Sequence, residues 1–256
     1  MVDTSRPHPV AGNALDVASA AARGVARQLR RLARPARLGV LRSTAPISTC
    51  WGLDRGTPID RYYIGLFLAS HAADIRGRCL EVRDTGYLDR YGSGVSSRDV
   101  VDIDPTNTRA TFVADLVAAD SIPADTFDCF VLTQTLQFVD DPRAALRHVH
   151  RILAPGGVLL LTVPVISRVG PGERDQDRWR FTEVGCRSLL GPLFGPELSI
   201  RSYGNVLSAV AFLEGMAAEE LRRDELDVED QAYPVIVSAR AIKTATSSGH
   251  TTIGSR

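Results

Sequence analysis

Lysine is almost absent from this chain of 256 residues, since Lys243, near the C-terminal end, is the only one. This absence removes a Schiff-base lysine and a phosphate-loop lysine from the candidate chemistry. Cysteine is scarce as well, and the four cysteines show no paired spacing: Cys50, Cys79, Cys129 and Cys186. We therefore interpret them as reduced and mostly buried thiols, and we expect no metal site.

Long apolar runs are also missing. No stretch approaches 18 apolar residues and no signal peptide is visible, so we expect no integral membrane segment and a cytoplasmic protein. The formal net charge is +0, which gives no indication of a nucleic-acid partner. With 44% hydrophobic residues, the chain can bury a substantial core as one domain.

Charge is nevertheless uneven along the chain. Residues 1–42 hold eight arginines against two acids, and residues 14–32 have helical spacing with apolar residues on one side and arginines on the other. We expect a basic helical extension over residues 1–47. It could pack on its own domain, join subunits of a homo-oligomer or lie on an anionic membrane surface. The C-terminal residues 244–256 are rich in Ser, Thr and Gly and predict a disordered tail.

From residue 77 onward, strand and helix patterns alternate. The middle strands are continuous apolar runs, as expected for strands covered on both faces. The predicted strands are 79–83, 99–103, 111–115, 128–133, 157–163, 197–203 and 234–242. The predicted helices are 60–74, 142–153, 183–193 and 206–222, and the segment 154–157 should end a helix and start a strand. This pattern predicts a doubly wound α/β domain with its ligand at the carboxyl ends of the strands.

Acidic residues mark the ends of the first three strands. Glu81 lies in the first strand, Asp102 ends the second and Asp115 ends the third. The segments "FDCFVLTQTLQFVDDP" and "RAALRHVHRILAPGGVLLLTVP" follow. In this order the features resemble class I S-adenosylmethionine (SAM)-dependent methyltransferases, and the likeness covers residues 77–243. The resemblance implies a mostly parallel seven-stranded sheet in which the strand near 234–242 is antiparallel and next to 157–163.

The resemblance also implies roles at a SAM site. Asp102 would accept hydrogen bonds from the ribose hydroxyls, Asp115 and Leu116 would face the adenine, and Glu81 would orient the loop near the amino end of the cofactor. The alternative for Asp102 and Asp115 is that they cap the following helix or turn. The candidate cofactor-binding residues are Glu81, Arg83, Gly86, Asp102, Ile103, Asp115, Leu116 and Thr133.

The loop after the first strand departs from the glycine-rich pattern of the family. Placed directly after Glu81, the three glycine positions become Arg83, Thr85 and Tyr87, and a one-residue deletion would bring only Gly86 onto the third. A non-glycine residue in the left-handed conformation costs about 1–2 kcal/mol, much less than the roughly 8 kcal/mol of a micromolar ligand. The loop could bind SAM differently, bind it weakly or hold something else. Arg83 and Asp84 could also pair with each other or with a substrate.

Two polar-aromatic segments are candidates for substrate contact. Residues 48–76 form either a lid or a structural clasp, and the segment 179–182 is either a substrate contact or a core anchor with a helix cap. The candidate substrate-binding residues are Arg61, Tyr62, Tyr63, Gln137, Trp179 and Arg180. Gln137 stands where the family often has histidine, and an amide cannot act as a general base. No catalytic residue is assigned, and only His71 and Arg180 remain as candidates.

These features lead to two hypotheses about function. The first is a SAM-dependent methyltransferase that acts on a small metabolite or glycan precursor, at oxygen, mainly by aligning the reactants. The arginine-rich composition is typical of a high-GC bacterial source and would suit specialised metabolism. The alternative is a methyltransferase-like protein that does not methylate, either a binding or scaffold subunit or an enzyme with other chemistry in the same pocket. The altered loop is the observation that favours this alternative.

Overall fold

The computed structural model describes residues 39–244 and, before them, residues 22, 25–26, 28–29 and 32–33. Contacts within the chain define two units, Met1–Ala45 and Pro46–Arg256. In the first unit the described residues 22–33 are helical, and a short 3-10 helix, η1, spans Gly39–Arg42. Most of the predicted helix at 14–32 and nearly all of the predicted C-terminal tail lie outside the described residues.

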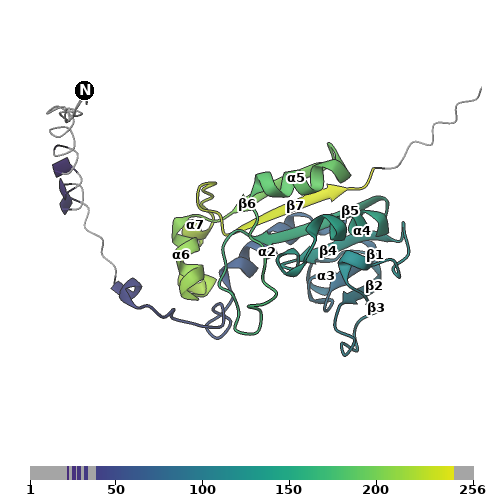
Figure 1. The fold of residues 1–256 in the computed structure, drawn as a ribbon, viewed down its shortest axis with the longest axis horizontal. Helices are drawn as coiled ribbons and strands as arrows, with labels where there is room; N and C mark the ends of the chain where they lie inside the picture. Colours follow the sequence, from purple (N-terminus) through teal and green to yellow (C-terminus); the bar gives the residue numbers. More distant parts are fainter. Residues whose placement is uncertain (1–21, 23–24, 27, 30–31, 34–38, 245–256) are drawn as a thin grey trace, which may run out of the picture. The chain divides into compact units, whose positions relative to one another are not determined.

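The second unit is built on a seven-stranded sheet in the order β3-β2-β1-β4-β5-β7-β6. All strands are parallel except β7, which pairs antiparallel with both β5 and β6 (Figure 1). The strands are β1 (Gly77–Val82), β2 (Val95–Asp102), β3 (Phe112–Val113), β4 (Phe127–Thr133), β5 (Leu153–Pro164), β6 (Leu198–Tyr203) and β7 (Ile236–Ile242). The predicted doubly wound sheet and its antiparallel strand next to β5 are confirmed.

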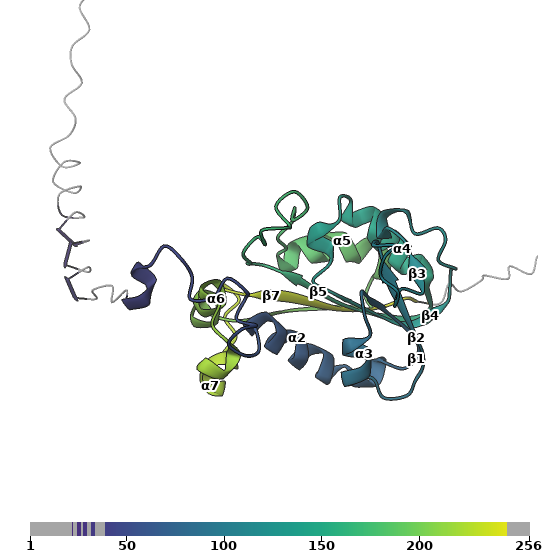
Figure 2. The same cartoon turned by 90° about the horizontal axis from the view of Figure 1, so that it is seen from below.

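Helices cover both faces of the sheet (Figure 2). On one face lie α4 (Pro142–Ile152) and α5 (Glu183–Phe194), and on the other lie α2 (Ile59–Ser70) and α3 (Gly86–Tyr91). Successive residues of β5 alternate between the two cores: Leu159 and Leu161 pack with the α4–α5 side, whereas Leu160 packs with the α2 side. Because both faces are covered, the central strands need to be apolar throughout.

Several predicted boundaries need correction, and among the strands β2 begins at Val95 rather than 99 and β3 spans only Phe112–Val113. The predicted helix 206–222 ends at Glu214, because Gly215 adopts a left-handed conformation (φ 73°) that stops α6 (Val206–Glu214). The first helix ends at Ser70 rather than 74, and the 3-10 helix η2 (Ala72–Asp74) follows it. The segment 154–157 lies inside β5, which already begins at Leu153.

The remaining elements are short. The sequence patterns did not indicate α3, because six residues are too few to show a helical period. The others are the 3-10 helices η3 (Leu116–Ala118), η4 (Leu136–Phe138) and η5 (Ala218–Glu220), and helix α7 (Arg223–Leu226). In the part of the chain that is described, no helix combines the length and the apolar character needed to cross a membrane.

The segment before α2 is fastened to the region after α6. The Ser48 amide donates to the Glu214 carbonyl, Thr57 accepts from the Ala218 amide, and Arg55 pairs with Glu220. These contacts hold residues 48–58 against the α6–η5 region. We propose that this segment acts both as a clasp and as one wall of the site described next.

Candidate functional site

The larger of two adjoining cavities lies at the carboxyl ends of β1, β2 and β4. Its volume is about 960 Å³, and the loops after these strands form most of its wall. The strand order reverses between β1 and β4, so that the loops after these two strands diverge. Ligands of open α/β sheets bind at such a switch point.

All the candidate cofactor-binding residues come together in this cavity: Glu81, Arg83, Gly86, Asp102, Ile103, Asp115, Leu116 and Thr133. Asp102 ends β2 and Asp104 lies two residues beyond it, and the two carboxylates differ in their surroundings. Asp102 accepts hydrogen bonds from the Asp104 amide (3.1 Å) and the Asn107 side chain (2.7 Å), which leaves lone pairs on both of its oxygens. Asp104 accepts instead from the amide and hydroxyl of Thr106.

Arg83 occupies the first glycine position of the loop and has the backbone conformation that favours glycine, with φ at 71°. Its carbonyl accepts from the Asn107 side-chain amide at 2.8 Å, and the same amide donates to Asp102. Asn107 therefore joins the loops after β1 and β2. Of the two alternatives for Arg83 and Asp84, an ion pair between them is not formed, and Asp84 accepts from the Gly86 amide.

Glu81 is a buried carboxylate that holds the start of α3. Only 3% of its surface is exposed, and it accepts from the amides of Tyr87 (3.1 Å) and Leu88 (2.9 Å). Burial raises the pKa of Glu81 to about 7, and the nearby acids Asp84 and Asp89 act in the same direction, against the two amide hydrogen bonds. Glu81 thus orders the loop after β1 and is also one of the residues that line the larger cavity.

Asp115 has the capping role that the sequence left open. It precedes η3 and accepts from the Val117 amide at 3.0 Å, while Leu116 is buried. Asp115 is also one of the residues that line the larger cavity. Asp115 can therefore cap η3 and face a ligand at the same time.

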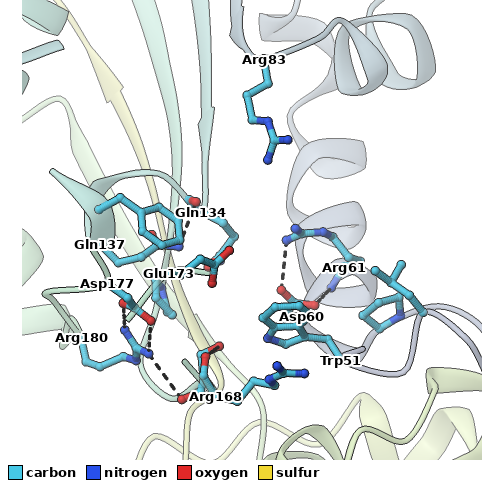
Figure 3. Close-up of a pocket in the computed structure, with 15 residues that line it drawn as sticks. Trp51, Asp60, Arg61, Arg83, Gln134, Gln137, Arg168, Glu173, Asp177 and Arg180 are labelled. Carbon is cyan, nitrogen blue, oxygen red and sulfur yellow. Dashed lines mark hydrogen bonds and ion pairs between the residues drawn. The ribbon is translucent and has the colours of Figure 1, made fainter. Parts of the chain in front are cut away.

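The smaller cavity, of about 260 Å³, adjoins the larger one and shares part of its wall. Figure 3 shows its polar side chains converging from the loops after β1, β4 and β5 and from the start of α2. The residues that line both cavities are Arg61, Arg83, Gln134, Phe138 and Glu173. A molecule in the smaller cavity would therefore lie next to one in the larger.

Some charges in the smaller cavity pair with each other. Arg61 contacts Asp60 at 3.0 Å, and Arg180 donates to both oxygens of Asp177. Burial raises the pKa of Asp60, against the effects of Arg61. Within the described residues, Glu173 forms no ion pair.

Backbone strain is concentrated here. Among the described residues, four that are not glycine have positive φ: Trp51, Arg83, Asp125 and Gln134. All but Asp125 line the smaller cavity. Such strained residues cluster at functional sites, where the surrounding structure holds them in place.

Several candidates lie away from both cavities. His71 follows the last turn of α2, at the opposite end of the helix from Arg61 and roughly 15 Å along its axis. The Tyr62 hydroxyl bonds Asp227, and Tyr63 is buried with its hydroxyl on the Leu226 carbonyl. Trp179 donates to the Val139 carbonyl and lines neither cavity. His71 thus lies far from both cavities, and the hydroxyls of Tyr62 and Tyr63 and the indole of Trp179 are engaged by other groups of the protein.

The structure also adds residues that the sequence did not single out. Asn107, Gln134, Arg168 and Glu173 are the most informative of them. Gln134 directly follows β4, so its place at a strand end was the one available signal. The others lie on loops whose paths depend on tertiary contacts. Of the earlier substrate candidates, Arg61, Gln137 and Arg180 do line the smaller cavity.

Comparison with known families supplies the identification. A family model described as a methyltransferase domain matches residues 62–193, which is more than half of the chain. The chain belongs to this methyltransferase family. It is a SAM-dependent methyltransferase, with SAM as the methyl donor. The lining of the larger cavity suits SAM. It includes a carboxylate with free lone pairs, Asp102, at the end of β2 and an apolar side chain, Leu116.

Solved structures similar to this methyltransferase include other methyltransferases. An N-methyltransferase from Bradyrhizobium japonicum has 16% identity and a TM-score of 0.45, with 73% of this chain and 98% of that one covered. A methyltransferase from Thermotoga maritima has 20% identity and a TM-score of 0.45, with 72% of this chain and 93% of that one covered. One from Mesorhizobium loti has 17% identity and a TM-score of 0.47, with 75% of this chain and 100% of that one covered. No curated protein matches the chain.

Proposed function

We propose that this methyltransferase transfers the methyl group of SAM to a hydroxyl oxygen of a small molecule held in the smaller cavity. The observation that carries the proposal is the shared wall of the two cavities, together with the carboxylates of Asp60 and Glu173 in the smaller one. A hydroxyl acceptor must lose its proton, and a carboxylate within reach can take it. A metabolite or glycan precursor of modest size suits the volume of about 260 Å³.

The cofactor-binding roles follow from the positions in the larger cavity. When bound, SAM supplies an electrophilic methyl group on its sulfonium. Asp102 would hold the ribose hydroxyls, because two neighbouring hydroxyls can donate to one carboxylate. Leu116 and Ile103 offer apolar surface for the adenine. Glu81 and Arg83 lie at the other loop and would face the amino-acid end.

The residues of the smaller cavity would mainly position the acceptor. Alignment of two bound reactants removes most of the entropic barrier to a displacement at carbon, so that little acid–base machinery is needed. Glu173 is the best placed proton acceptor, since it lines both cavities and forms no ion pair with another described residue. Gln137 contributes an amide and would orient the acceptor rather than deprotonate it.

Two measurements test this function. Calorimetry should show that the full chain binds SAM and its demethylated product. Incubation with methyl-labelled SAM and a panel of small alcohols, phenols and amines should then label a hydroxyl compound, and Glu173→Gln should slow the transfer roughly a hundredfold without weakening SAM binding. Label found only on amines would refute the oxygen assignment. If no SAM is bound, the alternative of a protein that does not methylate takes its place.

Arg83→Gly should separate backbone strain from function. We expect the free energy of unfolding to rise by about 0.5–1 kcal/mol, because glycine relieves the left-handed conformation but loses more backbone entropy on folding. SAM affinity should fall several-fold, because Arg83 lines both cavities and its guanidinium pairs with no carboxylate of the described chain. Chemical denaturation and calorimetry measure the two effects.

Asp125→Gly provides the matched control, because Asp125 also has positive φ but lines neither cavity. It should leave SAM affinity unchanged. Equal or tighter SAM binding by the Arg83→Gly variant would show that the arginine only obstructs the loop.

A further inference from the structure

Arg168 is a cation fixed in place with part of its hydrogen-bonding capacity unused. Its guanidinium lies over the Trp51 ring, 4.2 Å from the centroid, and its Nη1 is buried with no hydrogen-bond partner in the structure. Stacking occupies the face of a guanidinium and leaves the N–H donors in its plane free. A buried donor without an acceptor costs free energy, so Nη1 is suited to an acceptor from a ligand.

The residues around Arg168 are closely packed. Trp51 has positive φ and begins a turn that includes Gly52. Gly170 allows the tight packing, since a Cβ there would lie 3.1 Å from the Trp51 ring and 2.5 Å from the carboxylate of Glu173. Figure 3 shows Arg168 and Trp51 together on one side of the smaller cavity.

Other polar atoms of the same cavity are also unpaired. The side-chain amide nitrogen of Gln134 and the side-chain oxygen of Gln137 are buried without a partner. Both residues line the smaller cavity, and Gln134 lines the larger one as well. One donor and one acceptor next to the cofactor cavity match a hydroxyl group, which can accept and donate.

The charge balance decides which anion fits. After the pairs Arg61–Asp60 and Arg180–Asp177 are removed, the cavity keeps two cations, Arg83 and Arg168, and one anion, Glu173, a net charge of +1. A single negative charge neutralises this wall. A phosphate dianion would instead leave excess negative charge close to the carboxylates of Asp60, Glu173 and Asp177.

Resting on the function proposed above, we propose that the methyl acceptor is a hydroxy acid whose carboxylate is bound by Arg168. Its hydroxyl lies between Gln134 and Gln137, on the side of the cofactor cavity. Arg168 and Trp51 thereby determine specificity for an acidic substrate. The proposal gives a role to three buried polar atoms that the protein leaves without partners.

The experiment compares acids with their neutral counterparts on the full chain saturated with the demethylated cofactor. The probes are lactate, 3-hydroxybutyrate and 4-hydroxybenzoate, each with its amide, and 4-hydroxyphenyl phosphate. Calorimetry should show at least one acid binding roughly tenfold or more tightly than its amide, because a charge-assisted pair with the partly buried Arg168 guanidinium is lost in the amide. Arg168→Gln should abolish this preference, while Arg168→Lys keeps the charge without the planar fork and should retain only part of it.

Arg174→Gln is the matched control, since Arg174 lies exposed on the same loop and lines neither cavity. It should keep the preference, and all variants should keep the parent's cofactor affinity, which reports on folding. The proposal is overturned if no acid is bound better than its amide, if the preference survives Arg168→Gln, or if the phosphate is preferred. Failure to bind the cofactor would instead refute the proposed function, and the acid–amide comparison on the protein alone would still test Arg168.

Discussion

Asp102→Ala should weaken SAM binding by roughly ten- to a hundredfold, as measured by calorimetry. A hydrogen bond to a charged group is worth about 1.5–3 kcal/mol, and each 1.4 kcal/mol corresponds to a factor of ten. Because the loop after β1 lacks glycine at its usual positions, we expect SAM affinity to depend more heavily on this carboxylate. In the parent, the Asn107 amide donates to both Asp102 and the Arg83 carbonyl, and the substitution removes the first of these hydrogen bonds.

The control for this result lies two residues away. Asp104 also lines the larger cavity, but it is exposed on the loop beyond the end of β2, and its Oδ1 is oriented by the amide and hydroxyl of Thr106. Asp104→Ala should therefore change SAM affinity by less than about twofold. Asp102→Asn tests the contribution of the charge, since asparagine keeps the shape of the side chain and one acceptor oxygen. It should weaken SAM binding less than Asp102→Ala does. Equal losses at positions 102 and 104 would contradict the assignment of Asp102 to the ribose.

Glu81→Gln should remove a large part of the pH dependence of stability. The pKa of Glu81 is raised from 4.5 to about 7 in the folded protein, so the folded state binds this proton more tightly than the unfolded state. This contribution to stability is complete below pH 4.5 and is lost as the pH rises through about 7. One pKa unit corresponds to about 1.4 kcal/mol. Between pH 4.5 and about 7, the free energy of unfolding of the parent should therefore fall by up to about 3 kcal/mol relative to that of the variant.

Urea denaturation of both proteins at several pH values measures this difference. The glutamine oxygen can still accept from the start of α3, so the variant should fold. Glu183→Gln, the same exchange at the first residue of α5, reports the effect of removing a carboxylate elsewhere. A parent and a Glu81→Gln variant with parallel stability curves from pH 4.5 to 8 would show that Glu81 is ionised throughout.

The sheet could be predicted because its signals are local. Apolar runs such as 128–133 and 157–163 mark strands buried on both faces, and the residues at their ends mark the edge at which ligands bind. For this reason the candidate cofactor residues all meet in one cavity. Short elements such as α3 were not predicted. The start of α3 is stabilised by the Glu81 carboxylate, and the helix is too short for a helical period to appear in the sequence.

The smaller cavity was harder to predict, because contacts between distant parts of the chain place its lining residues. Aromatic residues were expected to contact substrate, yet Tyr63 is in the core and Trp179 bonds a backbone carbonyl. Arg168 and Glu173 carry no signal in the sequence, since the loop that holds them has neither period nor motif. Their placement depends on Trp51, more than a hundred residues earlier in the chain. Pair contacts over such separations cannot be read from a single sequence.

The Asn107 amide donates to both the Arg83 carbonyl and Asp102, so it joins the loops after β1 and β2, and we expect the two loops to be ordered together. A ligand group that immobilises one loop also removes freedom from the other. The ribose end and the amino-acid end of the cofactor would then be recognised together, and fragments of it should bind far more weakly than the sum of their contacts suggests. Recognition of the intact cofactor would then depend on an asparagine that itself need not touch it.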